Sequence, residues 1–158
     1  MGNIFAASEI VEIGIQIEEN GRDFYDTLST QSKNEKSKKI FRYLAKQEEE
    51  HKEVFQKLLG SIEKYEPAEA YPGEYFAYMN SLAIASVFTQ KDKGKEIAMK
   101  VKNEQEAIDI GMQAEKDSIV FYEGMKKVTS EHNHNVVDEV IAQEQEHLRQ
   151  LLELKTTL

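Results

Sequence analysis

Four long segments of the chain carry apolar residues at every third or fourth position, the spacing that places them on one face of an α-helix. The pattern predicts helices over residues 7–30, 35–59, 103–129 and 134–156. Short polar turns, STQSKNEKS and TSEHNHN, join the first helix to the second and the third to the fourth. Because a short connection makes consecutive helices antiparallel neighbours, we expect two helical hairpins.

Residues 60–102 are less regular and contain both prolines of the chain, Pro67 and Pro72. We expect one or two short helices here, forming a long crossover between the hairpins. A small second domain is the alternative, but the segment holds too little apolar material for a core of its own. Four long helices, two short turns and one long crossover describe an all-α, ferritin-like four-helix bundle. We expect it to occupy residues 1–158 as a single domain.

Ionisable residues interrupt the apolar faces of all four helices. In the second helix, Glu48 and His51 continue the face of Leu44, whereas the two glutamates between them fall outside it. The residues expected to point inward are Glu18, Glu48, His51, Glu115, Glu144 and His147. A solvated charged face is the ordinary explanation for such segments, so their inward position requires support from elsewhere in the sequence.

That support comes from an internal repeat. A shift of 97 residues aligns IGIQIE (13–18) with IGMQAE (110–115), and a shift of 96 aligns QEEEH (47–51) with QEQEH (143–147). Glu-x-x-His alone is a weak motif, and Glu131 with His134 shows the same spacing in a polar turn. The two repeated copies differ from that pair because each follows an inward glutamate on its partner helix by 29 or 30 residues.

Four buried carboxylates cannot remain ionised and unpaired in an apolar core. Either they become protonated or cations bind among them. Two divalent ions would balance the four charges, and the two histidines would each supply a neutral nitrogen. By analogy with di-metal carboxylate bundles, Glu48 and Glu144 should bridge the ions, while Glu18 and Glu115 bind one ion each. Oxygen and imidazole ligands without sulfur suit iron or manganese.

At these residues the chain resembles the rubrerythrin branch of the ferritin-like di-iron carboxylate proteins. The resemblance covers nearly the whole chain and rests on motifs present in both halves: Glu18 with Tyr25, Glu48-x-x-His51, Glu115 with Tyr122, and Glu144-x-x-His147. It implies two iron ions, with manganese as an alternative. It also implies that peroxide or dioxygen oxidises the di-iron(II) centre, often in defence against oxidative stress.

Two departures from the family pattern bear on activity. Rubrerythrins proper carry a cysteine-ligated rubredoxin domain, whereas this chain has no cysteine, so turnover would need an external electron donor. They also carry an additional glutamate three residues after the third-helix ligand, where this chain has Ser118. That change leaves open whether the ligand exchange of peroxidase turnover occurs here.

Two further pairs of residues recur in the repeat. The hydroxyls of Tyr25 and Tyr122 are expected to hydrogen-bond metal-bound carboxylates, although any buried tyrosine needs a polar partner. Gly14 and Gly111 each lie one turn before a ligand glutamate. They would either admit a small oxidant to the site or allow close packing of helices.

The composition of the chain bears on its partners and its location in the cell. A net charge of −9 argues against nucleic acid as a partner, and no apolar run approaches the ~20 residues of a membrane span. The start of the chain lacks signal-peptide features, so we expect a cytoplasmic protein, and we expect a homodimer. The function expected is reduction of peroxide or dioxygen. Iron storage by a ferroxidase cage and a metal-stabilised structural bundle remain alternatives.

Overall fold

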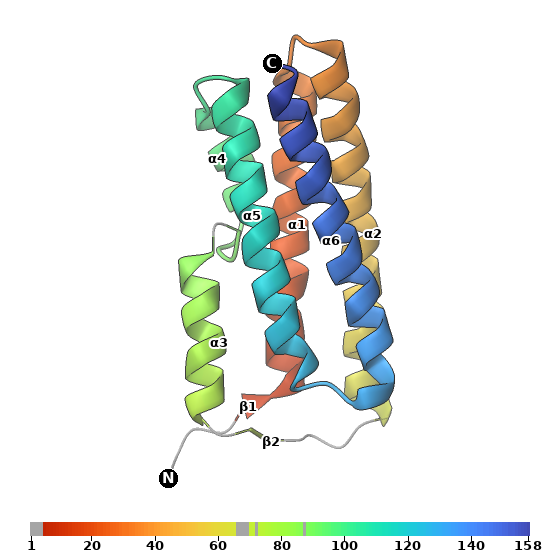
Figure 1. Cartoon of the computed structure of the whole chain (residues 1–158). Coiled ribbons are helices and arrows are strands. Elements are labelled where there is room, and N and C mark those ends of the chain that lie inside the picture. Colours follow the sequence, from red (N-terminus) through yellow and green to blue (C-terminus); the bar gives the residue numbers. More distant parts are fainter. Residues whose placement is uncertain (1–4, 66–69, 72, 87) are drawn as a thin grey trace.

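The computed structural model describes residues 5–65, 70–71, 73–86 and 88–158, and most of them are helical (Figure 1). Four long helices lie side by side, which confirms the all-α, ferritin-like bundle. In chain order the elements are β1 (Phe5–Ala6), α1 (Ala7–Gln31), α2 (Glu35–Tyr65), β2 (Ala70–Tyr71), α3 (Gly73–Ala85), α4 (Lys93–Lys100), α5 (Glu104–Lys126), the 3₁₀ turn η1 (Glu131–Asn133) and α6 (His134–Thr156).

Two helix ends differ from the prediction by more than one residue. Helix α2 runs to Tyr65 instead of residue 59, since no proline stops it before Pro67. Helix α5 ends at Lys126 instead of residue 129. There the backbone N–H groups of residues 127–129 bond carbonyls three residues back, which tightens the last turn so that it does not continue as α-helix. The two-residue antiparallel pairing of β1 with β2 was not predicted.

Asparagine side chains cap the N-termini of α2 and α5. The Asn34 side-chain oxygen accepts hydrogen bonds from the backbone N–H groups of Lys36 and Ser37, at 2.9 and 3.1 Å. The Asn103 side chain likewise accepts from the N–H of Glu106 at 2.8 Å. These contacts satisfy N–H groups that have no partner within the helix, so they define where α2 and α5 start.

The crossover contains two short helices: α3 packs against α5, and α4 packs against α1. Pro67 and Pro72 lie outside the described residues. Asn20, fully buried on α1, donates hydrogen bonds to the carbonyls of Phe88 (2.7 Å) and Gln90 (2.6 Å). Its side-chain oxygen accepts one from the N–H of Gly94 (3.1 Å). This single side chain therefore attaches the second half of the crossover to the bundle.

The apolar core is divided into two clusters along the length of the bundle. One cluster includes Val11, Phe55 and Met125, and the other includes Phe24 and Leu44. On α1 and α2, the inward ionisable residues occupy the positions between these two sets. None of the described helices is both long enough and apolar enough to cross a membrane.

Candidate metal centre

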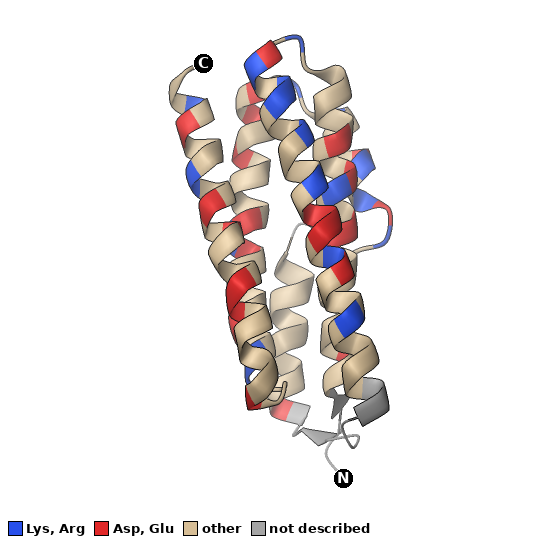
Figure 2. Cartoon of the chain, turned by 90° about the vertical axis from the view of Figure 1, so that its right-hand side faces the viewer, with Lys and Arg blue, Asp and Glu red and all other residues tan. Residues whose placement is uncertain are grey.

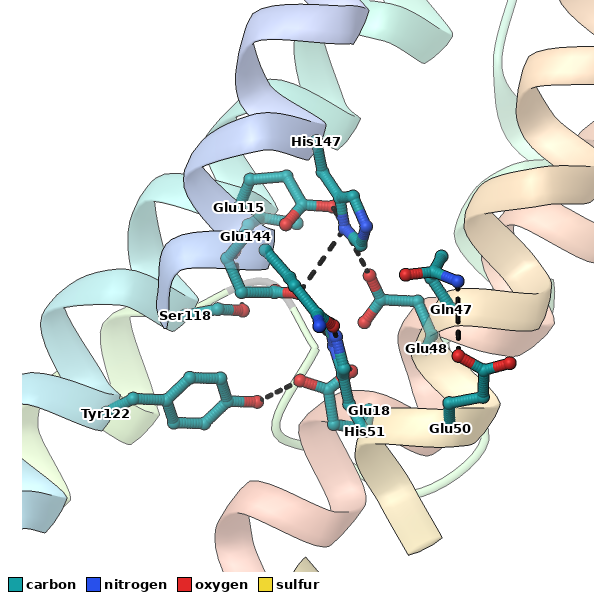
Figure 3. A network of polar contacts seen from close by, with 12 residues as sticks. Glu18, Gln47, Glu48, Glu50, His51, Glu115, Ser118, Tyr122, Glu144 and His147 are labelled. Atoms are coloured by element: carbon teal, nitrogen blue, oxygen red, sulfur yellow. Dashed lines mark hydrogen bonds and ion pairs between the residues drawn. The ribbon is translucent and has the colours of Figure 1, made fainter. Parts of the chain in front are cut away.

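All six residues predicted to point inward meet at the middle of the bundle (Figure 3). None is more than 3% exposed, although each is ionisable. All four long helices contribute: Glu18 comes from α1, Glu48 and His51 from α2, Glu115 from α5, and Glu144 and His147 from α6. We refer to these six residues as the carboxylate–histidine cluster.

The side-chain oxygen and nitrogen atoms of the cluster form two overlapping groups. In each group, four residues offer one atom apiece, and these atoms lie within 4.8 Å of one another. One group is Glu18, Glu48, His51 and Glu144, and the other is Glu48, Glu115, Glu144 and His147. Glu48 and Glu144 belong to both groups, so the two groups share two carboxylates.

Both imidazoles turn their Nδ1 atoms toward the carboxylates. Nδ1 of His51 lies 2.9 Å from Glu144 Oε1 and 3.5 Å from Glu18 Oε2. Nδ1 of His147 lies 3.3 Å from Glu48 Oε1 and 3.4 Å from Glu144 Oε1. The two rings are stacked with centroids 5.5 Å apart. Each histidine therefore presents one nitrogen to the same space as the carboxylate oxygens.

These converging atoms lack hydrogen-bond partners. Among the described residues, eight fully buried side-chain nitrogen or oxygen atoms make no hydrogen bond, and seven of them belong to the cluster: Glu18 Oε2, Glu48 Oε1, His51 Nδ1, Glu115 Oε2, both carboxylate oxygens of Glu144, and His147 Nδ1. Buried polar atoms are normally satisfied. Cations bound among these residues would supply the partners that these atoms lack, so the residues fit a metal centre.

Burial and mutual repulsion set the protonation of the carboxylates. Burial, reinforced by the neighbouring charge of Glu144, raises the pKa of Glu48 well above its usual range. The same two causes raise the pKa of Glu115 to about 8. Burial also acts to raise the pKa of Glu144, but the imidazoles of His147 and His51 beside it outweigh burial and hold the pKa low. Glu144 is thus the most readily ionised of these three carboxylates.

The histidines respond in the opposite sense. Burial lowers the pKa of His51, but the facing carboxylates of Glu18 and Glu144 outweigh burial and raise the pKa to about 12. Burial likewise opposes the charged form of His147, but the facing carboxylates of Glu115 and Glu144 outweigh burial and raise its pKa. Protons therefore neutralise the cluster in the protein alone, and a metal ion must displace them to bind.

Two tyrosines hold the carboxylates at the edges of the cluster. The fully buried hydroxyl of Tyr25 donates to Glu115 Oε1 at 2.7 Å, and that of Tyr122 donates to Glu18 Oε1 at 2.6 Å. Both therefore contact cluster carboxylates. The sequence did not show that each tyrosine contacts the glutamate of the opposite hairpin.

The repeated glycines are packing positions. A Cβ atom on Gly14 would lie 2.7 Å from Met125 Cε, and one on Gly111 would lie 3.2 Å from Tyr25 Oη and 3.3 Å from Leu151 Cδ1. Side chains from other helices already occupy the space beside both glycines. Of the two interpretations of these glycines, close packing is the one that the structure supports.

Neither half of the chain places a further carboxylate one turn beyond its first ligand glutamate. Ser118 is buried and its hydroxyl donates to the carbonyl of Ala114 in its own helix, at 2.9 Å. The corresponding residue of the first half is Gly21, where a Cβ would lie 3.0 Å from Glu48 Oε2.

The third Glu-x-x-His pair, Glu131 and His134, lies away from the cluster, and His134 Nε2 contacts the carbonyl of Thr129 at 3.1 Å.

Two residues beside the histidines were not recognised from the sequence. Gln143 Oε1 lies 2.5 Å from His51 Nε2 and accepts a hydrogen bond from it. In the neutral ring, this contact keeps the hydrogen on Nε2 and leaves Nδ1 free to bind a cation. The glutamine before each Glu-x-x-His copy, in QEEEH and QEQEH, was the signal available. Tyr43 packs edge-on against His147 with ring centroids 6.4 Å apart, and no repeated feature of the sequence indicated it.

A four-helix bundle that holds one glutamate from each of two helices and a Glu-x-x-His pair from each of the other two belongs to the ferritin-like carboxylate class. Within that class, the chain matches the rubrerythrin family over residues 9–155, and it belongs to that family. None of the curated proteins compared with it matches.

Two solved structures resemble this one over nearly its whole length. A Thermotoga maritima protein, described as a candidate ferritin-like diiron-carboxylate protein, is 31% identical with a TM-score of 0.75, and the match covers 99% of this chain and 98% of that one. A hypothetical protein from Pyrococcus furiosus has a TM-score of 0.70 over 96% of this chain and 89% of its own. At 20% identity the second likeness concerns the fold alone.

Proposed function

We propose that the protein is a di-iron carboxylate oxidoreductase that reduces hydrogen peroxide or dioxygen with electrons from an external donor. The observation that carries this proposal is the pair of overlapping ligand groups that share Glu48 and Glu144. Membership of the rubrerythrin family supports iron as the metal, and oxygen with imidazole ligands suits iron or manganese. Without cysteine, the chain cannot hold a cysteine-ligated redox centre of its own.

In this proposal Glu18 and His51 would hold one ion, Glu115 and His147 would hold the other, and the shared Glu48 and Glu144 would contribute to both. Iron at these positions would supply electrons to the oxidant and two multiply charged cations to stabilise it. The chain contributes orientation, because Tyr25 and Tyr122 hold the outer carboxylates. The two apolar parts of the core, on either side of the carboxylate–histidine cluster, keep bulk water from the reacting groups.

The proposal is tested by loading the protein anaerobically with two ferrous ions per chain and mixing it with hydrogen peroxide, or separately with dioxygen. We expect the near-ultraviolet absorption of ferric ions to grow faster than with free ferrous ion, and the faster oxidant identifies the substrate. The double variant Glu48→Gln/Glu144→Gln should lose this reaction. The matched variant Glu49→Gln/Glu50→Gln should keep it, since Glu49 is half-buried and Glu50 exposed, both outside the cluster. Loaded protein that reacts no faster than free iron would refute the proposal.

The seven unsatisfied buried atoms also favour a second candidate, a bundle that binds metal chiefly for stability. In that case metal would raise the melting temperature of the protein, and neither oxidant would react rapidly with the loaded site. The same pair of double variants separates the two functions. Under the structural alternative, the Glu48→Gln/Glu144→Gln variant loses only the metal-dependent part of the melting temperature.

A further inference from the structure

The first half of α2 is strongly basic in an acidic protein. Residues 33–46 contain six basic side chains and one acidic one, a net charge of +5, whereas the whole chain carries −9 and the remainder therefore −14. Figure 2 shows Lys and Arg along this half of the helix. In the part of the chain that the structure describes, none of the six forms an ion pair: Lys33, Lys36, Lys38, Lys39, Arg42 and Lys46.

The fold does not require this charge. The shift of 96 that relates the two hairpins places residues 33–46 on residues 129–142, which contain no lysine or arginine and three acidic residues. The second hairpin therefore builds the corresponding turn and helix start without lysine or arginine. A solvated helix needs no net charge of one sign, so the basic segment points to a function specific to this side of the bundle.

An aromatic side chain lies within the basic segment and reaches the metal cluster. Tyr43 is 46% exposed, and the edge of its ring contacts His147 with centroids 6.4 Å apart, a normal separation for an aromatic pair. Lys39 and Lys46 lie one helical turn to either side of it. At the equivalent position of the second hairpin the residue is Glu139. The cluster thus has an aromatic contact with the surface on this side of the bundle, and the second hairpin does not repeat it.

The surface around Tyr43 is shaped as a shallow groove between α2 and α6. A groove of about 290 Å³ is lined by Lys36, Lys39 and Tyr43 on one side and by Arg149 and Glu153 on the other. Arg149 is neutralised by ion pairs with Glu153 (3.0 Å) and another α6 glutamate. The positive charge of the groove therefore comes from α2. We name Lys36, Lys39, Tyr43 and Lys46 the α2 basic face.

We propose that the α2 basic face docks an acidic one-electron carrier protein, and that the electron enters the cluster through the Tyr43–His147 contact. This inference rests on the proposed redox function. Each docking event would oxidise the carrier by one electron and pass that electron to one ferric ion held by the cluster, so two events would be needed for the two ions of the proposed function.

Charge and geometry favour a small protein over other anionic partners. An extended polyanion or an anionic membrane would also meet the rest of the protein, whose residues outside 33–46 carry a formal net charge of −14 and would repel it. A carrier protein touches one limited patch, as transient electron-transfer complexes do. An electron carrier is also the partner that could use the contact between the exposed Tyr43 and His147, because that contact joins the surface to the cluster.

The docking step is tested with a plant-type [2Fe–2S] ferredoxin of strongly acidic surface as the probe, using full-length protein with and without iron. The variant Lys36→Glu/Lys39→Glu/Lys46→Glu should lower the association rate constant by about 10- to 1,000-fold at low ionic strength. The control Lys91→Glu/Lys95→Glu/Lys102→Glu changes the charge equally at exposed lysines of the crossover region. It should bind nearly as the unsubstituted chain does. Association with the unsubstituted chain should weaken as salt is added.

The electron-entry step is tested by the reduction rate of the diferric protein. Tyr43→Leu keeps the three lysines of the α2 basic face but should lose most of the fast reduction, and Tyr43→Phe should restore it because the ring contact remains. Reduction by reduced 5-deazariboflavin, a small uncharged donor, should be equal in all these variants. Fast reduction of the Tyr43→Leu variant by bound ferredoxin would overturn the role of Tyr43.

Several outcomes would overturn the docking surface. Equal ferredoxin binding by the two triple-lysine variants would exclude it. So would a change of oligomeric state in the first variant alone, which would make the face a contact between copies, or binding to phosphatidylserine vesicles without binding to ferredoxin. These results are separable from the proposed function, because reaction of the ferrous protein with peroxide or dioxygen needs no carrier. If neither oxidant reacts while ferredoxin still docks on this face, the function fails and the surface stands.

Discussion

The hydroxyl of Tyr25 on α1 donates a hydrogen bond of 2.7 Å to Glu115 on α5. The contact is reciprocated, because Tyr122 on α5 donates one of 2.6 Å to Glu18 on α1. Each hairpin thus orients the first ligand glutamate of the other hairpin. The site is consequently a property of the paired hairpins, and neither one could assemble it alone.

Replacing Tyr25 by Phe should weaken metal binding, because residues that orient ligands typically contribute about 10–100-fold to metal affinity. Manganese or cobalt titration of the metal-free protein measures this change. The control is Tyr75→Phe, which removes a comparable hydrogen bond, from Tyr75 on α3 to the carbonyl of Gly124 (2.6 Å). Both variants should lose some thermal stability, but only Tyr25→Phe should lose affinity. Equal affinities in the two variants would show that Tyr25 is merely a buried tyrosine with a polar partner.

Gln143 and Gln47 occupy equivalent places in the repeat but make different contacts. Gln143 accepts a hydrogen bond from Nε2 of His51, whereas Gln47 donates one to Glu50 at 3.1 Å (Figure 3). Gln143→Leu should therefore lower the affinity of one cation position by about 10–100-fold, and Gln47→Leu should leave affinity nearly unchanged. Isothermal titration resolves the two positions. If both variants weaken binding alike, the two histidines are supported equivalently.

The stability of the metal-free protein should fall as the pH rises from about 6 to about 9. Glu115, with its pKa raised to about 8 by burial, keeps a proton in the folded state that the unfolded chain releases near its ordinary value. His51, with its pKa raised to about 12 by the facing carboxylates, also holds a proton that the unfolded chain releases above about 6.5. In both cases the folded state binds more protons, so rising pH favours unfolding.

Each such proton contributes at most about 1.4 kcal/mol per pH unit. Urea unfolding of the chelator-treated protein at several pH values measures the slope, and the Glu115→Gln variant should show a shallower one. Because cations displace these protons, metal affinity should rise over the same range. Metal-free protein that becomes more stable between these pH values would contradict the assignment of protons to the cluster.

The attachment of the crossover to α1 depends on a glycine. A Cβ on Gly94 would lie 1.9 Å from the backbone oxygen of Asn20, so Gly94→Ala should push α4 away from α1 and destabilise the fold by about 1–3 kcal/mol. Gly60→Ala is the matched control, since no atom lies within 4 Å of its added methyl group and α2 is helical there. It should stabilise the protein by about 0.5–1 kcal/mol. Equal effects in urea unfolding would mean that α4 can move without cost.

Much of the site could be predicted from the sequence because its chemistry is periodic. Glu48 and His51 stand three residues apart on a face otherwise occupied by apolar residues, and helix geometry alone places such a pair side by side. The repeat in the second hairpin then shows that the pattern is not accidental. The same periodicity predicted the four long helices, whose existence follows from apolar spacing even where α2 and α5 end at other residues than expected.

Tertiary structure alone decided which side chains meet across helices. Spacing along one helix cannot tell whether Tyr25 reaches the glutamate of its own helix or Glu115 on another, because that depends on how α1 and α5 approach each other. The same holds for Gln143 beside His51 and for Tyr43 beside His147. Local periodicity determined which residues face inward. Only the packing of the two hairpins determined how the cluster is held and where it lies close to the surface.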